Sequence, residues 1–214
     1  MINVFISGQG YFAEQVLRAY LNNGINVIGV CCPIGDKYIG KLANTFDIPI
    51  IHNLNVNSLN TLNKTIDLGV CAHSFDYIGK LTRYKSKHGW IGYHPSLLPR
   101  HRGRSSIEWA LRMKDIITGG TVFWLNAGID RGDIAYQDWF FIEPKLFNLN
   151  PKEAARILWQ DKLQEIGVRL LLKAVKDIEA GVYIRIPQDN RFSTWEPSTE
   201  VKDIYRPDAL MIGN

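Results

Sequence analysis

The sequence has few cysteines and no long apolar run, and both absences narrow the class of protein. Among its 214 residues are three cysteines, and because Cys31 and Cys32 are adjacent, a disulfide framework is excluded. No stretch of about 18 apolar residues occurs, so no membrane-spanning helix is expected. The first residues lack the basic stretch and cleavage site of a secretory signal. We therefore expect a cytoplasmic protein with reduced thiols and no membrane partner.

Several catalytic signatures are also missing. The five histidines and three cysteines show no HxxxH or CxxC spacing, so no metal site is expected. A GxSxG nucleophile elbow is absent. Cys71 lies within an apolar run, which favours a core position over a nucleophile. The net charge of +4 is modest, and no basic, aromatic-rich segment of the kind that binds nucleic acid is present.

Short apolar runs alternate with helical patterns along the first half of the chain. Strands are expected at 2–7, 26–32, 48–51, 67–72 and 90–93. The intervening patterns predict helices that cross from one parallel strand to the next. With 46% apolar residues, the chain can form one substantial core. We predict an α/β fold, with a Rossmann-like, mostly parallel sheet and helices on both faces.

The second half of the chain is expected to complete the same sheet. The pair Gly119–Gly120 indicates a turn that leads into a strand at 121–125, and a further strand is expected at 134–142. Apolar residues at helical spacing predict one long helix at 151–180, which Gly181 ends.

No periodicity follows this helix. We predict one domain at 1–182 and an irregular tail at 183–214 that packs on it. The apolar and aromatic side chains of the tail suit either such packing or the contact of a homodimer; they are Trp195, Tyr205, Leu210 and Met211.

The first expected strand is followed by Gly8-Gln9-Gly10, which opens a helical pattern. This is a relaxed form of the dinucleotide-binding fingerprint. That fingerprint needs an acidic residue about 20 positions further on, and none occurs before Asp36. A tight turn that only packs is therefore favoured, while a substrate or nucleotide site at Gly8 and Gly10 stays open.

A histidine, His94, follows the expected strand at 90–93. Ligands of open α/β sheets collect at the carboxyl ends of strands, and Pro95 and Pro99 restrict the loop that carries this side chain. Position alone favours a structural histidine over a catalytic one. The basic run 100–104 that follows is either a solvated loop or a rim that attracts anions.

The segment Gly128-Ile129-Asp130-Arg131-Gly132-Asp133 stands at another strand end. Its glycines allow sharp turns, and Asp130 is either a capping residue of a polar loop or a carboxylate directed into a cleft. A carboxylate beside an imidazole stabilises the protonated ring and fixes its orientation. The pair His94 and Asp130 therefore suits proton transfer near neutral pH.

Together these two segments resemble a known family. The run YHPSLLPRHRG at 93–103, followed by GIDRGD at 128–133, is similar to enzymes that use 10-formyltetrahydrofolate. These include glycinamide ribonucleotide transformylase, methionyl-tRNA formyltransferase, sugar-nucleotide N-formyltransferases and the hydrolase domain of 10-formyltetrahydrofolate dehydrogenase. The likeness spans roughly 1–181 and is closest to that hydrolase domain. It implies a Rossmann-like sheet with the folate in a cleft at the strand ends.

The resemblance also implies roles for individual residues. His94 and Asp130 correspond to the catalytic histidine and aspartate. The residues that correspond to the folate-binding positions are Phe75, Asp76, Tyr77, Ile78, Ser96, Leu97, Leu98, Pro99, Ile129 and Asp133. For the acceptor side we expect Arg100, Arg102, Arg104, Gly8 and Gly10, which would suit an anionic small-molecule amine.

One position departs from the transferases. They usually place asparagine two residues before the histidine, as a donor to the oxyanion, and here that position is Gly92. Loss of such a donor typically raises a barrier by about 3 kcal/mol. Three interpretations stay open: water replaces the amide, Asn126 reaches into the site, or turnover is slow. The hydrolase domain of the dehydrogenase lacks the same asparagine.

The expected function is transfer of a formyl group from 10-formyltetrahydrofolate to an amine. A 10-formyltetrahydrofolate hydrolase is the first alternative, and a nucleotide- or folate-binding protein without turnover is the second. Transfer RNA is not expected as a partner, because only the tail follows the catalytic part, where methionyl-tRNA formyltransferases carry a further domain. The identity of the acceptor is left open.

Overall fold

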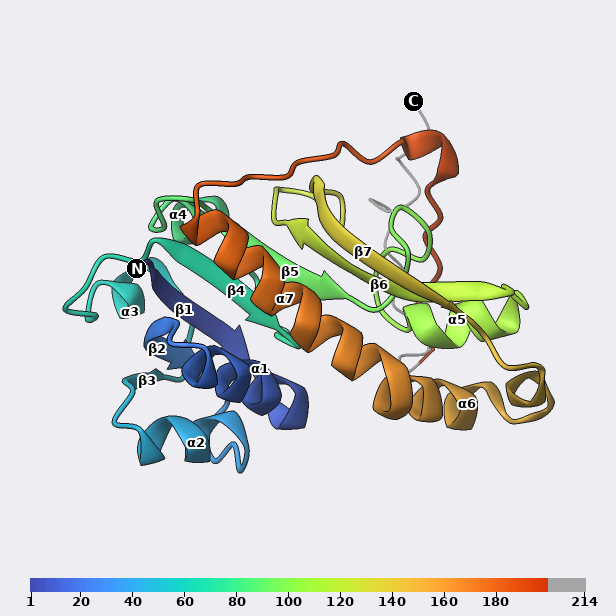
Figure 1. The fold of residues 1–214 in the computed structure, drawn as a ribbon, viewed down its shortest axis with the longest axis horizontal. Coiled ribbons are helices and arrows are strands. Elements are labelled where there is room, and N and C mark those ends of the chain that lie inside the picture. Colours follow the sequence, from blue (N-terminus) through green and yellow to red (C-terminus); the bar gives the residue numbers. More distant parts are fainter. Residues whose placement is uncertain (200–214) are drawn as a thin grey trace.

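A seven-stranded sheet forms the centre of the computed structural model, which describes residues 1–199 (Figure 1). The first half contains β1 (Asn3–Gly8), α1 (Gly10–Asn22), β2 (Asn26–Cys31), α2 (Ile39–Thr45), β3 (Ile50–Ile51), α3 (Val56–Leu59), β4 (Leu68–Ala72), α4 (Lys80–Arg83) and β5 (Trp90–His94). The second half contains α5 (Ser106–Arg112), β6 (Ile117–Trp124), β7 (Ile134–Phe141), a 3-10 turn at Pro144–Asn148, α6 (Pro151–Leu158), a π-helical turn at Trp159–Leu163, α7 (Gln164–Glu179) and a 3-10 turn at Asn190–Phe192.

The strand order is β3-β2-β1-β4-β5-β6-β7, which confirms the predicted fold. Strands β1 to β5 pair in parallel, β6 runs antiparallel to β5, and β7 runs antiparallel to β6. The carboxyl ends of β1, β4 and β5 therefore meet at one edge of the sheet. His94, the last residue of β5, stands at this edge.

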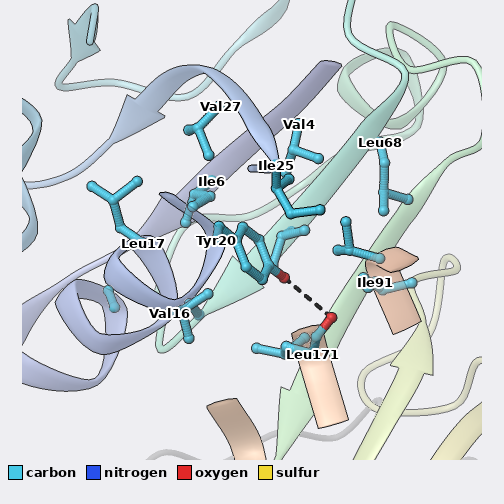
Figure 2. Close-up of a cluster of buried hydrophobic side chains, with 14 of the residues drawn as sticks. Val4, Ile6, Val16, Leu17, Tyr20, Ile25, Val27, Leu68, Ile91 and Leu171 are labelled. Carbon is cyan, nitrogen blue, oxygen red and sulfur yellow. Dashed lines mark hydrogen bonds between the residues drawn. The ribbon is translucent and has the colours of Figure 1, made fainter. Parts of the chain in front are cut away.

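Apolar side chains cover both faces of the sheet. One cluster packs the sheet against α1 and α7, and Figure 2 shows Tyr20 of α1 within it. The Tyr20 side chain is fully buried, and its hydroxyl donates a 3.3 Å hydrogen bond to the Leu171 carbonyl of α7. A second cluster on the other face includes Phe5, Ile78 and Trp90. Both clusters hold the parallel strands whose ends build the site.

The glycine pair 119–120 lies inside β6, so the predicted turn there was wrong. A Cβ atom at Gly119 would stand 2.0 Å from the carbonyl oxygen of Asp138 on β7. A Cβ at Gly120 would stand 2.1 Å from the hydroxyl of Tyr93 on β5. These glycines are needed because the β7 backbone and the Tyr93 side chain approach β6 closely, and not because the chain reverses direction here.

The long helix predicted at 151–180 is interrupted by the π-helical turn at 159–163, so a single α-helix was wrong. The Leu163 carbonyl in this turn accepts a 2.7 Å hydrogen bond from the Tyr93 hydroxyl, which ties the helix to the residue before His94. None of the helices within residues 1–199 is long and apolar enough to cross a bilayer.

Residues 183–199 follow an extended path past β6 and β7 towards α5 (Figure 1). Ile186 exchanges two backbone hydrogen bonds with Ile134 of β7, at 2.8 and 2.9 Å. Further along, Trp195 forms a bridge with Arg102, and the Pro197 carbonyl accepts from the Trp109 indole at 2.7 Å. Of the residues considered for a dimer contact, Tyr205, Leu210 and Met211 lie outside the described residues.

Candidate active site

The imidazole of His94 is buried, with only 7% of the residue exposed. Its Nε2 atom lies 2.7 Å from the carbonyl oxygen of His101. A carbonyl oxygen only accepts hydrogen bonds, so this contact assigns a proton to Nε2. Nδ1 is therefore the nitrogen left free to take up and release a proton.

The carboxylate of Asp130 faces that second nitrogen. Its Oδ2 is 3.7 Å from His94 Nδ1, too far for a direct hydrogen bond but close enough for electrostatic attraction. The same oxygen accepts a 2.8 Å hydrogen bond from the Gly103 amide. Asp130 has φ of +52°, and a Cβ at nearby Gly132 would overlap the Trp124 carbonyl oxygen at 1.5 Å. The loop is thus a tightly constrained turn.

Hydrogen bonds with Thr121 of β6 fix the loop after His94. The Thr121 hydroxyl donates to the Ser96 carbonyl at 2.6 Å and accepts from the Leu98 amide at 3.1 Å. Ser96 is fully buried, and its hydroxyl donates to the Arg100 carbonyl. The Ser96 side chain and the Leu98 amide therefore maintain the loop, whereas Leu97 and Pro99 are half-buried beside them.

Among the residues expected to bind folate, Phe75 and Tyr77 are exposed and Ile78 is buried in the core. The guanidinium of Arg104 lies 5.4 Å from the centre of the Phe75 ring. This cation–π contact joins the loop after β4 to the loop after β5. Ile129, beside Asp130, is 48% exposed. Exposed apolar side chains thus occur on the loop after β4 and on the loop between β6 and β7.

Asp76 faces the end of β1. Its Oδ2 accepts a 3.0 Å hydrogen bond from the Ser7 hydroxyl, and the Cys31 thiol lies 3.5 Å away. Burial, and then the charge of Asp76, raise the pKa of the Cys31 thiol above its usual range. The backbone carbonyl of Asp133, another predicted folate-binding residue, accepts from the Trp124 amide at 2.8 Å.

Gly92 offers little space for a larger side chain. A Cβ atom there would be 3.0 Å from Leu125 Cδ1, 3.4 Å from Cys71 Cβ and 3.5 Å from Phe123 Cε1. The space around that Cβ atom is therefore lined by apolar groups, and Leu125 Cδ1 is the atom that would have to move. Asn126 is exposed, and its side-chain oxygen accepts from the Gly128 amide within its own loop. No hydrogen bond joins Asn126 to His94 in the part of the chain that the structure describes.

The basic run does not form one exposed rim. Arg100 pairs with Asp115 at 3.0 Å. Arg102 is only 2% exposed, and its guanidinium donates to Gln188 Oε1 at 2.7 Å. The expectation that Arg102 meets an acceptor is corrected, because its charged group faces the tail. Only Arg104 of the three is exposed and without an acidic partner among the described residues.

His101 was not singled out from the sequence. Its buried ring lies between two carboxylates, with Nε2 2.8 Å from Asp115 and Nδ1 3.2 Å from Glu196. Its backbone carbonyl is the acceptor that orients His94. Asp115 and Glu196 are far from His101 in sequence, and no spacing pattern indicates their contact. The tail therefore reaches the loop that follows His94.

The glycine-rich turn after β1 packs tightly. A Cβ at Gly8 would be 2.2 Å from the Ala72 carbonyl oxygen, and Gly10 has φ of +70°. The Gly10 amide donates to Asp36 Oδ2 at 2.9 Å, while Oδ1 accepts from the Tyr38 amide. A carboxylate thus occupies the helix N-terminus where a dinucleotide phosphate would bind. This arrangement favours the packing interpretation.

Comparison with known proteins identifies the class. Residues 1–148 match the family model described as formyl transferase, and the chain therefore belongs to this family. It is 31% identical over 210 residues to cytosolic 10-formyltetrahydrofolate dehydrogenase of Xenopus laevis, covering 92% of this chain and 22% of that protein. It is also 31% identical over 216 residues to methionyl-tRNA formyltransferase of Syntrophus aciditrophicus, covering 94% of this chain and 67% of the relative.

Solved structures support the fold. The N-formyltransferase from Helicobacter canadensis, in complex with folinic acid and dTDP-3-aminofucose, superposes with a TM-score of 0.69 at 21% identity. The match covers 94% of this chain and 72% of that one. The chain spans about a fifth of the length of the dehydrogenases that it matches.

Proposed function

We propose that this protein transfers the formyl group of 10-formyltetrahydrofolate to a small amine, with His94 and Asp130 in proton transfer. The observation that supports this most strongly is the orientation of His94. Its Nε2 is held by a backbone carbonyl, and its Nδ1 faces a carboxylate at the carboxyl edge of the sheet. An imidazole held in this way exchanges protons at one known atom.

The reaction is an acyl transfer. The acceptor nitrogen attacks the formyl carbon and forms a new C–N bond, and the bond from that carbon to N10 of the folate breaks. One proton leaves the attacking amine and one is taken up by the departing nitrogen. His94 Nδ1 relays a proton between them, and Asp130 stabilises the imidazolium that forms meanwhile. The charged imidazolium also attracts the oxyanion of the tetrahedral intermediate.

The residues at the site fit a folate. Phe75 and Ile129 are 61% and 48% exposed, and they lie on the loop after β4 and on the loop between β6 and β7. Exposed apolar side chains of this kind suit a flat aromatic ring. Hydrogen bonds with the Thr121 hydroxyl fix the loop at 94–100, so its backbone forms a rigid side of the site.

The acceptor is proposed to be a small amine, and an anionic group on it would meet Arg104. Named relatives act on different acceptors, and the methionyl-tRNA formyltransferases indicate that tRNA is one alternative. The basic side chains that a large nucleic acid would need are partly committed here, since Arg100 pairs with Asp115 and Arg102 is buried. A small acceptor is therefore favoured.

Hydrolysis is the second candidate, and Gly92 is the observation that favours it. A site without an amide donor two residues before the histidine, with apolar Leu125 in that space, leaves oxyanion stabilisation to His94 and bound water. Water would then be the acceptor, and formate and tetrahydrofolate the products.

One assay separates these candidates. Purified protein is incubated with 10-formyltetrahydrofolate alone, and the absorbance change that accompanies tetrahydrofolate formation is followed; the incubation is then repeated with a panel of amines. Release only when one amine is present supports the transferase and names its acceptor. Steady release without an amine supports the hydrolase. Folate binding without any release would overturn both and favour a binding protein.

A further inference from the structure

Gln188 of the tail contacts both loops that carry the catalytic pair. Its Nε2 donates to the carbonyl oxygens of Asp130, at 2.9 Å, and Gly132, at 2.7 Å. Its Oε1 accepts from the guanidinium of Arg102 at 3.0 and 2.7 Å. Both ends of one side-chain amide are thereby fully used, and each end holds a different loop.

The first loop needs such support. Asp130 has a positive φ, a conformation that non-glycine residues rarely adopt and that persists only when surrounding contacts fix it. The Asp130 carboxylate is held by the Gly103 amide, and its carbonyl by Gln188. Without the second contact, the carbonyls of Asp130 and Gly132 lose their shared donor and the turn has fewer constraints.

The second loop depends on Arg102, which stands between two residues of the site. The carbonyl of His101, on one side, orients His94; the amide of Gly103, on the other, binds Asp130. The Arg102 side chain is buried, and burial lowers the pKa of its guanidinium. Its hydrogen bonds to Gln188 are part of what compensates for that burial.

We propose that Gln188 is a positioning residue of the active site, which sets the placement of Asp130 relative to His94 by bridging their two loops. The expected loss of kcat rests on the proposed function, whereas the expected loosening of the Asp130 loop rests on the geometry alone. The proposed role thus belongs to a tail residue that lies beyond residues 1–148, the part that the family model matches.

The chain offers a matched control. Asn190 Oδ1 accepts from the same Arg102 guanidinium at 3.0 Å, yet no hydrogen bond joins its side chain to the Asp130 loop among the described residues. Gln188→Ala should lower kcat by about 10–100-fold, since misplacement near 1 Å has that effect. KM for 10-formyltetrahydrofolate should stay within about twofold, and Asn190→Ala should keep kcat within about threefold. Equal kcat values for the two variants would overturn the proposal.

A variant of the same size separates the two halves of the bridge. Gln188→Glu still accepts from Arg102 but cannot donate to the carbonyls of Asp130 and Gly132. It should therefore be as slow as Gln188→Ala, and a wild-type rate would show that donation to the Asp130 loop is unimportant.

Hydrogen exchange gives a readout that does not depend on turnover. Peptides over 128–133 should exchange faster in Gln188→Ala than in Asn190→Ala or the wild type. If the wild-type protein releases no formyl group, the proposed function fails, and exchange alone decides the inference. Unchanged exchange in Gln188→Ala would then overturn it.

Discussion

Introducing an amide at Gly92 tests whether the packing there keeps an oxyanion donor out. The Cβ of Gly92→Asn would lie 3.0 Å from Leu125 Cδ1, well inside the 3.5–4.0 Å at which carbon atoms attract. Neither Cys71 nor Phe123 approaches as closely. Leu125 is therefore the obstruction, and Leu125→Ala should remove it.

The magnitudes follow from this geometry. Overpacking of this kind costs about 1–3 kcal/mol, and for a domain of this size each kcal/mol lowers Tm by about 2–4 °C. Leu125→Ala alone should cost about 1–2 kcal/mol, below the range for a fully buried leucine, because Leu125 is only partly buried. In the double variant the overlap is absent, so we expect a favourable coupling energy of about 1–2 kcal/mol.

The assay is a double-mutant cycle in urea, together with formyl-release rates. Gly92→Asn/Leu125→Ala should also transfer to an amine faster than Leu125→Ala, since an oxyanion donor lowers a barrier by about 3 kcal/mol. Additivity of the two stability changes within about 0.5 kcal/mol would refute the packing argument. A stable double variant without faster transfer would refute the catalytic one.

Three further predictions concern other parts of the chain. Burial, with a contribution from Asp36, raises the pKa of Cys32 to about 11. At pH 8, iodoacetamide should therefore alkylate Cys32 more than about 100-fold more slowly than free cysteine, and the rate should rise towards pH 11. Mass spectrometry measures this rate, and a value like that of free cysteine would contradict the burial. Tyr20→Phe removes one buried hydrogen bond and should cost about 0.5–1.5 kcal/mol, and an unchanged urea midpoint would count against it. Gly132→Ala forces a Cβ to within 1.5 Å of a carbonyl oxygen and should reduce formyl release by about 100-fold; a wild-type rate would argue against the tight turn.

Most of the sheet was predictable because its strands are short apolar runs that end at glycine, proline or a polar segment. The exceptions have physical causes. Gly119 and Gly120 look like a turn in the sequence, yet they lie inside β6 because β7 and Tyr93 approach too closely for a side chain. The buried Leu158 and Leu163 are five positions apart across the π-helical turn, and one such step among residues three or four apart still resembles a continuous helix, so the interruption was not predicted.

The candidate site was predictable where its residues follow strand ends. His94 and Asp130 are brought together as expected, although the loop between β6 and β7 leaves the sheet beside the amino end of β5 and reaches His94 through the contact of Asp130 with Gly103. The roles of His101 and Gln188 were not predictable, because each depends on contacts with distant residues that have no periodic pattern. Arg102 was expected to meet the acceptor because it lies in a basic run, and its contact with Gln188 could not be predicted from the sequence for the same reason.

The most direct test of the account is the rate at which tetrahydrofolate forms from 10-formyltetrahydrofolate, measured for the wild type, His94→Ala and Asp130→Asn under identical conditions. The account predicts that each variant is slower by at least about 100-fold, with an unchanged circular dichroism spectrum and a retained affinity for folate. Because the two side chains act as a unit, the double variant should be little slower than either single one. A near-normal rate in either variant would contradict the assignment of this pair.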